Sequence, residues 1–337
     1  MSLSTKYLGL DLKSPLIASS SPQNSKISYL RQLEDAGAAA VVLPSLFQEQ
    51  IESRDEELSS ASAKESDNNT ATSNYFPASE IAPYGLGPDE YLNLIRLAKE
   101  NLSIPVIASL NGATESDWVN YARLFQEAGA SAIELNNYYV PYDFSMSGRD
   151  IEQHFISILS IVRQAVTIPV SVKLLPFMSS LGHYVNELKC KGADGFVLFN
   201  RVLQPDIDLL TLRLNNRLLL SSKQEMSLSM LWISLLAQNQ KRQFSLAAST
   251  GVREVDDIIK YLLVGADVVM MTSVLLRHGP EYLKVLHDGL EKWVSSRGYS
   301  NLSELRGLMS KIWMAQEQGG GRKSYIKMLN AFQNAAV

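Results

Sequence analysis

Short apolar runs alternate with amphipathic stretches along most of the chain. The runs are short and rich in β-branched residues, which is typical of buried strands rather than helices. They predict strands at 16–18, 39–43, 106–110, 132–136, 170–173, 195–199, 245–249 and 268–271. Helical patterns lie between them; in TESDWVNYARLFQEAGA, Trp118, Tyr121 and Phe125 share a face and Gly129 ends the helix. This alternation predicts a parallel sheet covered by helices.

A weak internal repeat favours closure of that sheet into a barrel. Gly-Ala pairs precede the even-numbered predicted strands, at 37–38, 129–130, 192–193 and 265–266, and Ile-Pro-Val introduces the third and fifth strands. Glycine at these points can adopt the left-handed conformation that stops a helix. Eight such units occur without a glycine-rich dinucleotide motif after the first strand. We therefore predict a (β/α)8 TIM barrel rather than an open doubly wound sheet.

The pattern also divides the chain into parts. The barrel is expected over residues 1–300, with a short N-terminal strand pair in TKYLGLDLKSP, and a helical extension over 301–337. Residues 49–82 are rich in Ser, Asp, Asn and Glu and cannot bury much apolar surface. We interpret them as an insertion that is either a surface loop or a lid over the catalytic face.

Composition narrows the class of protein. The chain has 337 residues, 46% of them hydrophobic and 20% charged, which is typical of a globular enzyme. A net charge of −4 argues against a nucleic-acid surface, and no apolar run is long enough to cross a membrane. The N-terminus lacks a secretory pattern, so we expect a cytoplasmic protein. The single Cys190 excludes an intramolecular disulfide, and the four histidines show no ligand spacing, so no metal site is expected.

One lysine stands at the end of a predicted strand. Lys173 ends the fifth strand in IPVSVKLLP, on the face where parallel barrels carry their chemistry. Asn136 and Asn200 end the fourth and sixth strands and would flank it with amide groups, which suits a flat, polar heterocycle. The alternatives are a lysine whose stem covers the rim while its ammonium reaches water, and asparagines that cap loops.

Small hydroxylic residues follow the last two predicted strands. Thr250 and Gly251 follow the seventh strand, and Thr272 and Ser273 follow the eighth. Hydroxyls and backbone N–H groups are the donors that hold a phosphate, and barrels often bind phosphate at these adjacent loops. Either segment alone could be an ordinary turn, but together they favour a ligand phosphate.

These segments occur in a recognisable order. SPLIASSS, SLNG, IELN, VSVKLLP, FN, STGV and VGADVVMMTS, spread from about Thr5 to Arg297, resemble the dihydroorotate dehydrogenase family, most closely its soluble class 1 members. That family is an FMN-containing barrel that oxidises dihydroorotate to orotate in pyrimidine biosynthesis. The resemblance implies an FMN-dependent oxidoreductase acting on a CH–CH group, with hydride transfer to flavin N5, and would also allow a homodimer.

The resemblance implies roles for particular residues. Cofactor contacts are expected from Ala18, Ser19, Ser20, Asn111, Asn136, Lys173, Asn200, Thr250, Gly251, Thr272 and Ser273, and substrate contacts from Asn136, Asn137 and Asn200. Lys173 would lie at the flavin ring. Tyr139 occupies the position of the class 1 cysteine base and is the candidate base. A tyrosine has an unperturbed pKa near 10, so it needs a nearby cation to act as a base at neutral pH.

Other positions depart from the family pattern. The family's lysine after the second strand is replaced by Val42-Leu43-Pro44-Ser45, and the last asparagine of the cysteine motif is Pro141. The glycine-rich phosphate loop is replaced by residues 220–225, LSSKQE.

Two alternative functions therefore stay open: a Schiff-base aldolase-like lyase that uses Lys173, and a catalytically degenerate flavin barrel acting as a partner subunit. The expected partners are a small-molecule substrate, dihydroorotate or similar, and an electron-transfer partner, with no nucleic acid and no membrane.

Overall fold

The computed structural model describes residues 2–51, 86–112, 115–202, 204–215, 219–238, 242–311 and 322–335. Beyond residue 51, the predicted insertion at 49–82 lies outside the described residues.

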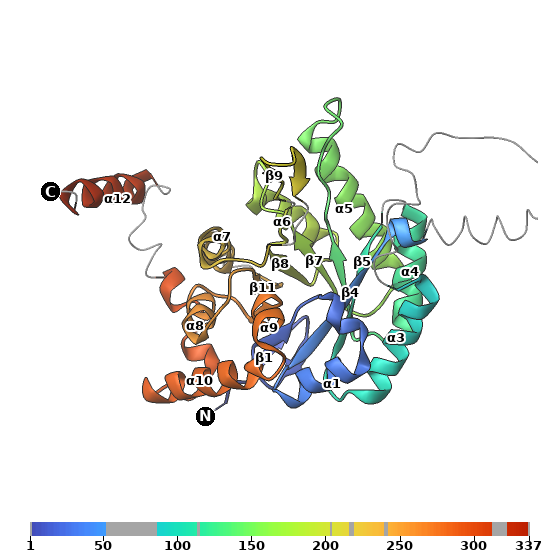
Figure 1. Ribbon diagram of the computed structural model, residues 1–337, viewed down its shortest axis with the longest axis horizontal. Helices are drawn as coiled ribbons and strands as arrows, with labels where there is room; N and C mark the ends of the chain where they lie inside the picture. The colour runs from blue at the N-terminus through green and yellow to red at the C-terminus, as the bar shows by residue number, and fades with distance from the viewer. Residues whose placement is uncertain are drawn as a thin grey trace, which may run out of the picture.

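Eight parallel strands close into a barrel, which confirms the predicted (β/α)8 fold (Figure 1). In chain order the strands are β3 (Leu16–Ala18), β4 (Ala40–Phe47), β5 (Val106–Asn111), β6 (Ala132–Asn136), β7 (Val170–Leu174), β8 (Gly195–Leu198), β11 (Ser245–Ser249) and β12 (Val268–Met271). The barrel closes where β12 pairs with β3. Each predicted strand is present, with ends that differ by at most four residues.

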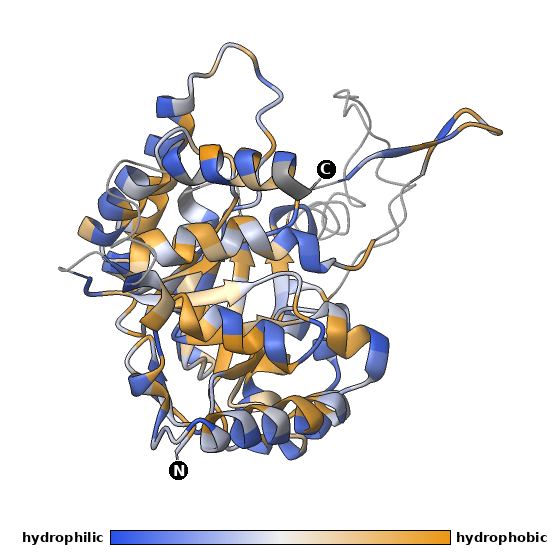
Figure 2. Cartoon of the chain, turned by 90° about the vertical axis from the view of Figure 1, so that its left-hand side faces the viewer, coloured by the Kyte–Doolittle hydropathy of each residue, from blue (hydrophilic) through white to orange (hydrophobic). Residues whose placement is uncertain are grey.

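Helices surround the barrel. They are α1 (Ile27–Asp35), α3 (Pro88–Asn101), α4 (Glu115–Glu127), α5 (Gly148–Ala165), α6 (Leu181–Cys190), α7 (Met226–Ala237), α8 (Val255–Leu263), α9 (Ser273–His278) and α10 (Tyr282–Ser296), with short 3-10 turns η1 (Pro22–Ser25), η2 (Lys223–Glu225) and η3 (Leu302–Glu304). Figure 2 shows hydrophobic residues on the strands and mixed residues along the helices, as expected for helices with one covered face.

The hydrophobic core has two parts. Outward-facing strand residues such as Ile133 and Leu135 pack against the helices, whereas inward-facing residues such as Ala132 and Val197 fill the barrel. The predicted N-terminal strand pair, β1 (Thr5–Tyr7) and β2 (Leu10–Leu12), closes the lower end of the barrel with buried side chains that include Tyr7. Because the described residues fill this end, the cavity of the barrel opens at the carboxyl ends of the strands.

Two further segments lie outside the barrel repeat. The hairpin of β9 (Asp206–Asp208) and β10 (Arg213–Asn215) interrupts the connection from β8 to α7. At the C-terminus, residues 302–311 return to the barrel, where the Gly307 N–H donates to the Leu262 carbonyl at 3.0 Å, and α12 (Arg322–Ala335) follows. None of the helices within the described ranges is both long and apolar enough to cross a membrane.

Candidate active site

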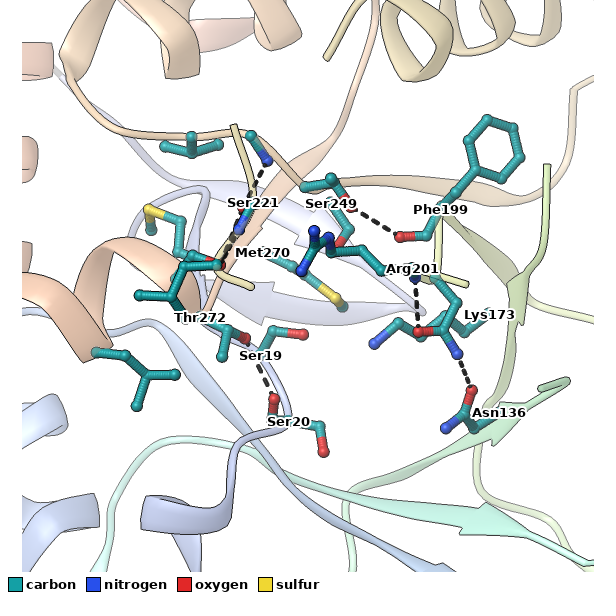
Figure 3. Close-up of a pocket in the computed structure, with 18 of the residues that line it drawn as sticks. Ser19, Ser20, Asn136, Lys173, Phe199, Arg201, Ser221, Ser249, Met270 and Thr272 are labelled. Carbon is teal, nitrogen blue, oxygen red and sulfur yellow. Dashed lines mark hydrogen bonds between the residues drawn. The ribbon is translucent and has the colours of Figure 1, made fainter. Parts of the chain in front are cut away.

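A cavity of about 440 Å³ opens at the carboxyl ends of the barrel strands. This volume lies within the range of about 300–1,000 Å³ that is typical of small-molecule sites. Figure 3 shows Lys173 and Asn136 on one side of the cavity, Ser221 and Thr272 on the other, and the side chain of Arg201 between them. The site therefore has a side with an ammonium and amides and a side with hydroxyls.

Lys173 extends from β7 into the cavity and is 9% exposed. Its partner across the strand register is Asn136 of β6. Glu134, two residues earlier on β6, is fully buried, and its Oε1 lies 3.7 Å from the Lys173 ammonium. Burial raises the pKa of the Glu134 carboxyl, and the Lys173 charge opposes that rise. The ammonium is therefore held between a carboxylate beneath it and the cavity above it.

A chain of hydrogen bonds orders the amides beside Lys173. The Asn200 amide donates to Asn136 Oδ1 at 2.6 Å, and the Asn136 amide donates to the Ser45 hydroxyl at 3.1 Å. Ser45 continues the chain to the Ser109 hydroxyl at 2.8 Å. Because each amide is fixed by its neighbour, the two asparagines present a preorganised polar wall to a ligand.

The other side of the cavity is built by three loops. The Ser221 N–H and hydroxyl both lie 3.0 Å from the Ser273 hydroxyl, and the Gly251 N–H donates to the Ser221 hydroxyl at 3.1 Å. Thr272 donates to the Ser20 carbonyl at 3.2 Å. These contacts bring the tails of β11 and β12 together with the loop before α7, and they concentrate small polar donors at one end of the cavity.

Gly251 has a backbone conformation that this packing requires. Its φ of +83° lies in the left-handed region, and a Cβ built there would lie 2.4 Å from Met226 Cγ and 2.8 Å from the Ser222 carbonyl oxygen. Only glycine therefore lets this loop approach the start of α7 so closely.

Sequence reasoning gave no role to Arg201, which also lines the cavity. Its Nε donates to Glu225 Oε2 at 2.8 Å, and its guanidinium also binds the Leu219 carbonyl and, at 3.2 Å, the Gln204 side chain. Arg201 therefore joins the two ends of the segment that contains the β9–β10 hairpin. Its position directly after Asn200, at the end of a predicted strand, is the signal that could have identified it.

Most of the predicted site residues come together here. The cavity is lined by Ser19, Ser20, Asn136, Lys173, Asn200, Thr250, Gly251, Thr272 and Ser273. Ala18, Asn111, Asn137 and Tyr139 are not among the described residues that line it. The fully buried Ala18 adjoins Ser19, and the Asn137 amide donates to the Tyr184 hydroxyl at 3.5 Å.

The structure places the candidate base beside the cavity rather than in it. The Tyr139 hydroxyl lies 3.7 Å from Met146 Sδ, and its ring packs edge-on against Phe155. The preceding residue, Tyr138, lines the cavity. A role for Tyr139 in catalysis would therefore require movement of the loop after β6, whereas Tyr138 already faces the site.

Comparison with known proteins agrees with this geometry. The family model described as dihydroorotate dehydrogenase matches residues 80–294. The chain belongs to the dihydroorotate dehydrogenase family. Members of this family are flavin oxidoreductases that act on a CH–CH group.

Three relatives show how far the similarity extends. The NAD-dependent dihydropyrimidine dehydrogenase subunit PreA of Escherichia coli K12 is 24% identical over 330 residues, covering 91% of this chain and 76% of that protein. The catalytic subunit of dihydroorotate dehydrogenase B (NAD(+)) of Methanothermobacter thermautotrophicus is 25% identical over 317 residues, covering 91% and 98%. The corresponding subunit of Listeria monocytogenes serotype 4a is 30% identical over 217 residues, covering 61% and 69%. The names of these three relatives thus refer to two different substrates, a dihydropyrimidine and dihydroorotate.

Proposed function

We propose that the protein is an FMN-dependent oxidoreductase that moves a hydride between the flavin and a small cyclic amide, dihydroorotate or a related pyrimidine. The observation that carries this proposal is the position of Lys173 inside the cavity, beside the bonded pair Asn136–Asn200 and opposite the hydroxyl-lined end.

The charged groups that face the cavity fit such a cofactor. Among the described residues, its lining includes two cations, Lys173 and Arg201, and no carboxylate, while the carboxylate partners of these cations, Glu134 and Glu225, lie behind the lining. This balance suits a ligand that carries a phosphate and gains negative charge on reduction. Thr250, Gly251, Thr272 and Ser273 would hold the phosphate through hydroxyls and N–H groups.

The remaining residues would act on the ring and on the substrate. When bound, FMN supplies the hydride acceptor. Lys173 would stabilise negative charge on the reduced ring, and Asn136 and Asn200 would orient ring and substrate through their amides.

The absorption spectrum of the purified protein tests this proposal. We expect a flavin spectrum, or FMN uptake by protein isolated without it, and bleaching of the flavin when dihydroorotate is added. A protein that takes up no FMN would refute the proposal. Bound FMN that dihydroorotate does not reduce would keep the cofactor and redirect the search to other cyclic amides.

The base can be identified by exchanging the two tyrosines separately. Tyr139 is the candidate from its position in the motif, and Tyr138 is the candidate from its position at the cavity. Each is replaced by phenylalanine, and the rate of substrate-dependent flavin reduction is measured by stopped flow. Replacement of the true base should lower the rate of flavin reduction by about 100-fold or more while FMN stays bound. Normal reduction in both variants would show that neither tyrosine is the base.

One observation favours a second candidate function. The E. coli relative is named as a subunit of an NAD-dependent enzyme, and this chain lacks the lysine that the family has at the second barrel strand, β4, and the family's cysteine base. A flavin barrel that passes electrons within a larger complex would bind FMN without turning over a small substrate on its own. Copurification of a partner, together with restored turnover when it is added, would support this function over the first.

Three further expectations stay predictions. The Schiff-base alternative would show Lys173 trapped by borohydride with a carbonyl substrate. A homodimer would elute from size exclusion with twice the chain mass. The cytoplasmic location expected from the N-terminal sequence requires fractionation of the source cells.

A further inference from the structure

Glu134 lies in the interior of the barrel, directly beneath the cavity. Ala132, on the same face of β6, belongs to the interior cluster, whereas Ile133 and Leu135 face the helices. The side chain of Glu134 is fully buried, and neither carboxylate oxygen has a hydrogen-bond partner among the described residues. The charged group that contacts it is the Lys173 ammonium, at 3.7 Å.

Packing alone gives no reason for a carboxylate at this position. The residues paired with Glu134 on the two neighbouring strands are Ser109 of β5 and Ser171 of β7, both fully buried. A buried carboxylate without hydrogen bonds destabilises the folded state, and a nearby ammonium only partly offsets that cost. Such costs tend to be retained where a charge has a function.

We propose that Glu134 is a positioning residue that holds the Lys173 ammonium at the floor of the cavity and weakens its charge toward the flavin ring. This inference rests on the proposed function. Lys173 stabilises the reduced ring, which carries negative charge, more than the oxidised ring. Glu134, on the far side of the ammonium, opposes that effect. The pair therefore sets the redox potential of the flavin between the values that either charge alone would give.

A double-mutant cycle on the FMN-loaded protein tests the proposal through the midpoint potential of the flavin. Lys173→Met should lower the potential because the stabilising cation is lost. Glu134→Gln should raise it, with about a tenfold change in the ratio of the FMN Kd values for the oxidised and reduced states, or about 30 mV for two electrons. In the Lys173→Met background, Glu134→Gln should leave the midpoint potential unchanged. Without its cation, the buried carboxylate takes up a proton and is already neutral.

Ser171→Ala is the matched control. This side chain is also buried, is paired with Glu134 across the strands, and donates its hydroxyl to the Ile133 carbonyl at 3.3 Å. We expect it to change stability but not potential. An unchanged potential in Glu134→Gln, or an equal rise in both Lys173 backgrounds, would overturn the proposal.

A second measurement keeps the pair testable without flavin. Urea unfolding of the apoprotein should show coupling: the double variant Glu134→Gln/Lys173→Met should lose less stability than the two single variants together. If no variant or wild-type protein binds FMN, the proposed function has failed. Coupling in unfolding would then confirm the ion pair but refute its role toward a flavin, and additive losses would refute the pair as well.

Discussion

At the scale of single residues, the site depends on the alternation of side chains along two neighbouring strands. Asn136 and Glu134 share one face of β6, and Lys173 and Ser171 share one face of β7, so these four side chains meet inside the barrel. Lys173 and Asn136 were predictable because they end strands. Glu134 was not assigned from sequence, although its signal was present: it lies two residues before a predicted site residue, within an otherwise apolar run.

The raised pKa of Glu134 gives a pH dependence with a defined sign. Its cause is first burial, opposed by the Lys173 charge, and the usual value is 4.5. The folded chain therefore holds this proton more tightly than the unfolded chain does. The ionised carboxylate lowers stability above the folded-state pKa, and this penalty disappears as the pH falls to 4.5 and below.

We accordingly expect the unfolding free energy of the wild type, relative to that of Glu134→Gln, to rise as the pH falls from the folded-state pKa of Glu134 to 4.5. Urea unfolding of both proteins across the window measures the difference, and Glu90→Gln, on the surface helix α3, serves as a comparison. A difference that falls as acid is added would mean that Lys173 lowers the pKa of Glu134 by more than burial raises it.

At the scale of elements, the hydroxyl-lined end is made by loops that come from distant parts of the chain. Thr250, Gly251, Thr272 and Ser273 were predictable because they directly follow strands. Arg201 was not assigned although it directly follows Asn200 at a strand end, and Ser221 was not assigned because its approach depends on how the connection from β8 to α7 folds back after its hairpin. The contacts of Arg201 with Leu219 and Glu225 fix that return, and no local sequence pattern encodes it.

Gly251→Ala should disrupt this end of the cavity. The new methyl group combines a strained φ with contacts of 2.4 and 2.8 Å to Met226 and Ser222. We expect a loss of about 3 kcal/mol in unfolding free energy and weaker FMN binding, measured by urea unfolding and by fluorescence titration of FMN.

Gly298→Ala is the matched control for strain alone. Gly298 has a φ of +77° but has nothing within 4 Å of a built Cβ, so it should lose only about 1 kcal/mol and bind FMN normally. Equal effects of the two substitutions on FMN binding would show that the packing of Gly251 against α7 does not shape the site.

At the scale of the whole molecule, the barrel was predictable because each unit of its repeat has a short sequence pattern of its own. The Gly-Ala pairs before alternate strands and the apolar runs each act over a few residues. The β9–β10 hairpin was not predicted: its sequence lacks strong strand periodicity, and Leu210 at its tip is 97% exposed. The place of the N-terminal strand pair was not predictable either, because it depends on contacts across the chain, such as the Leu8 N–H with the Ser245 hydroxyl at 2.9 Å.

A polar network at the lower end of the barrel joins the N-terminal strand pair and the segment that contains Arg306 to the start of β12. Asp267, just before β12, accepts from the Leu246 N–H at 2.7 Å and pairs with Arg306 at 2.9 Å and with Arg242. Thr5 of β1 donates to the Asp267 carbonyl at 3.1 Å. Asp267 is largely buried while both arginines are partly exposed, so solvent screens part of the attraction.

Asp267→Asn should therefore destabilise the whole fold without changing the cavity. The substitution keeps the shape but leaves two guanidinium groups near one another without their carboxylate. We expect a loss of about 2–3 kcal/mol in urea unfolding, below the full cost of breaking a buried pair because of that screening. FMN affinity should stay at the wild-type value, since the network lies at the opposite end of the barrel.

Lys284→Gln is the control for a surface ion pair. It breaks the exposed pair with Asp288 and should cost no more than about 0.5 kcal/mol. Similar losses in the two variants would show that the contacts of Asp267 with Thr5 and Arg306 do not stabilise the fold.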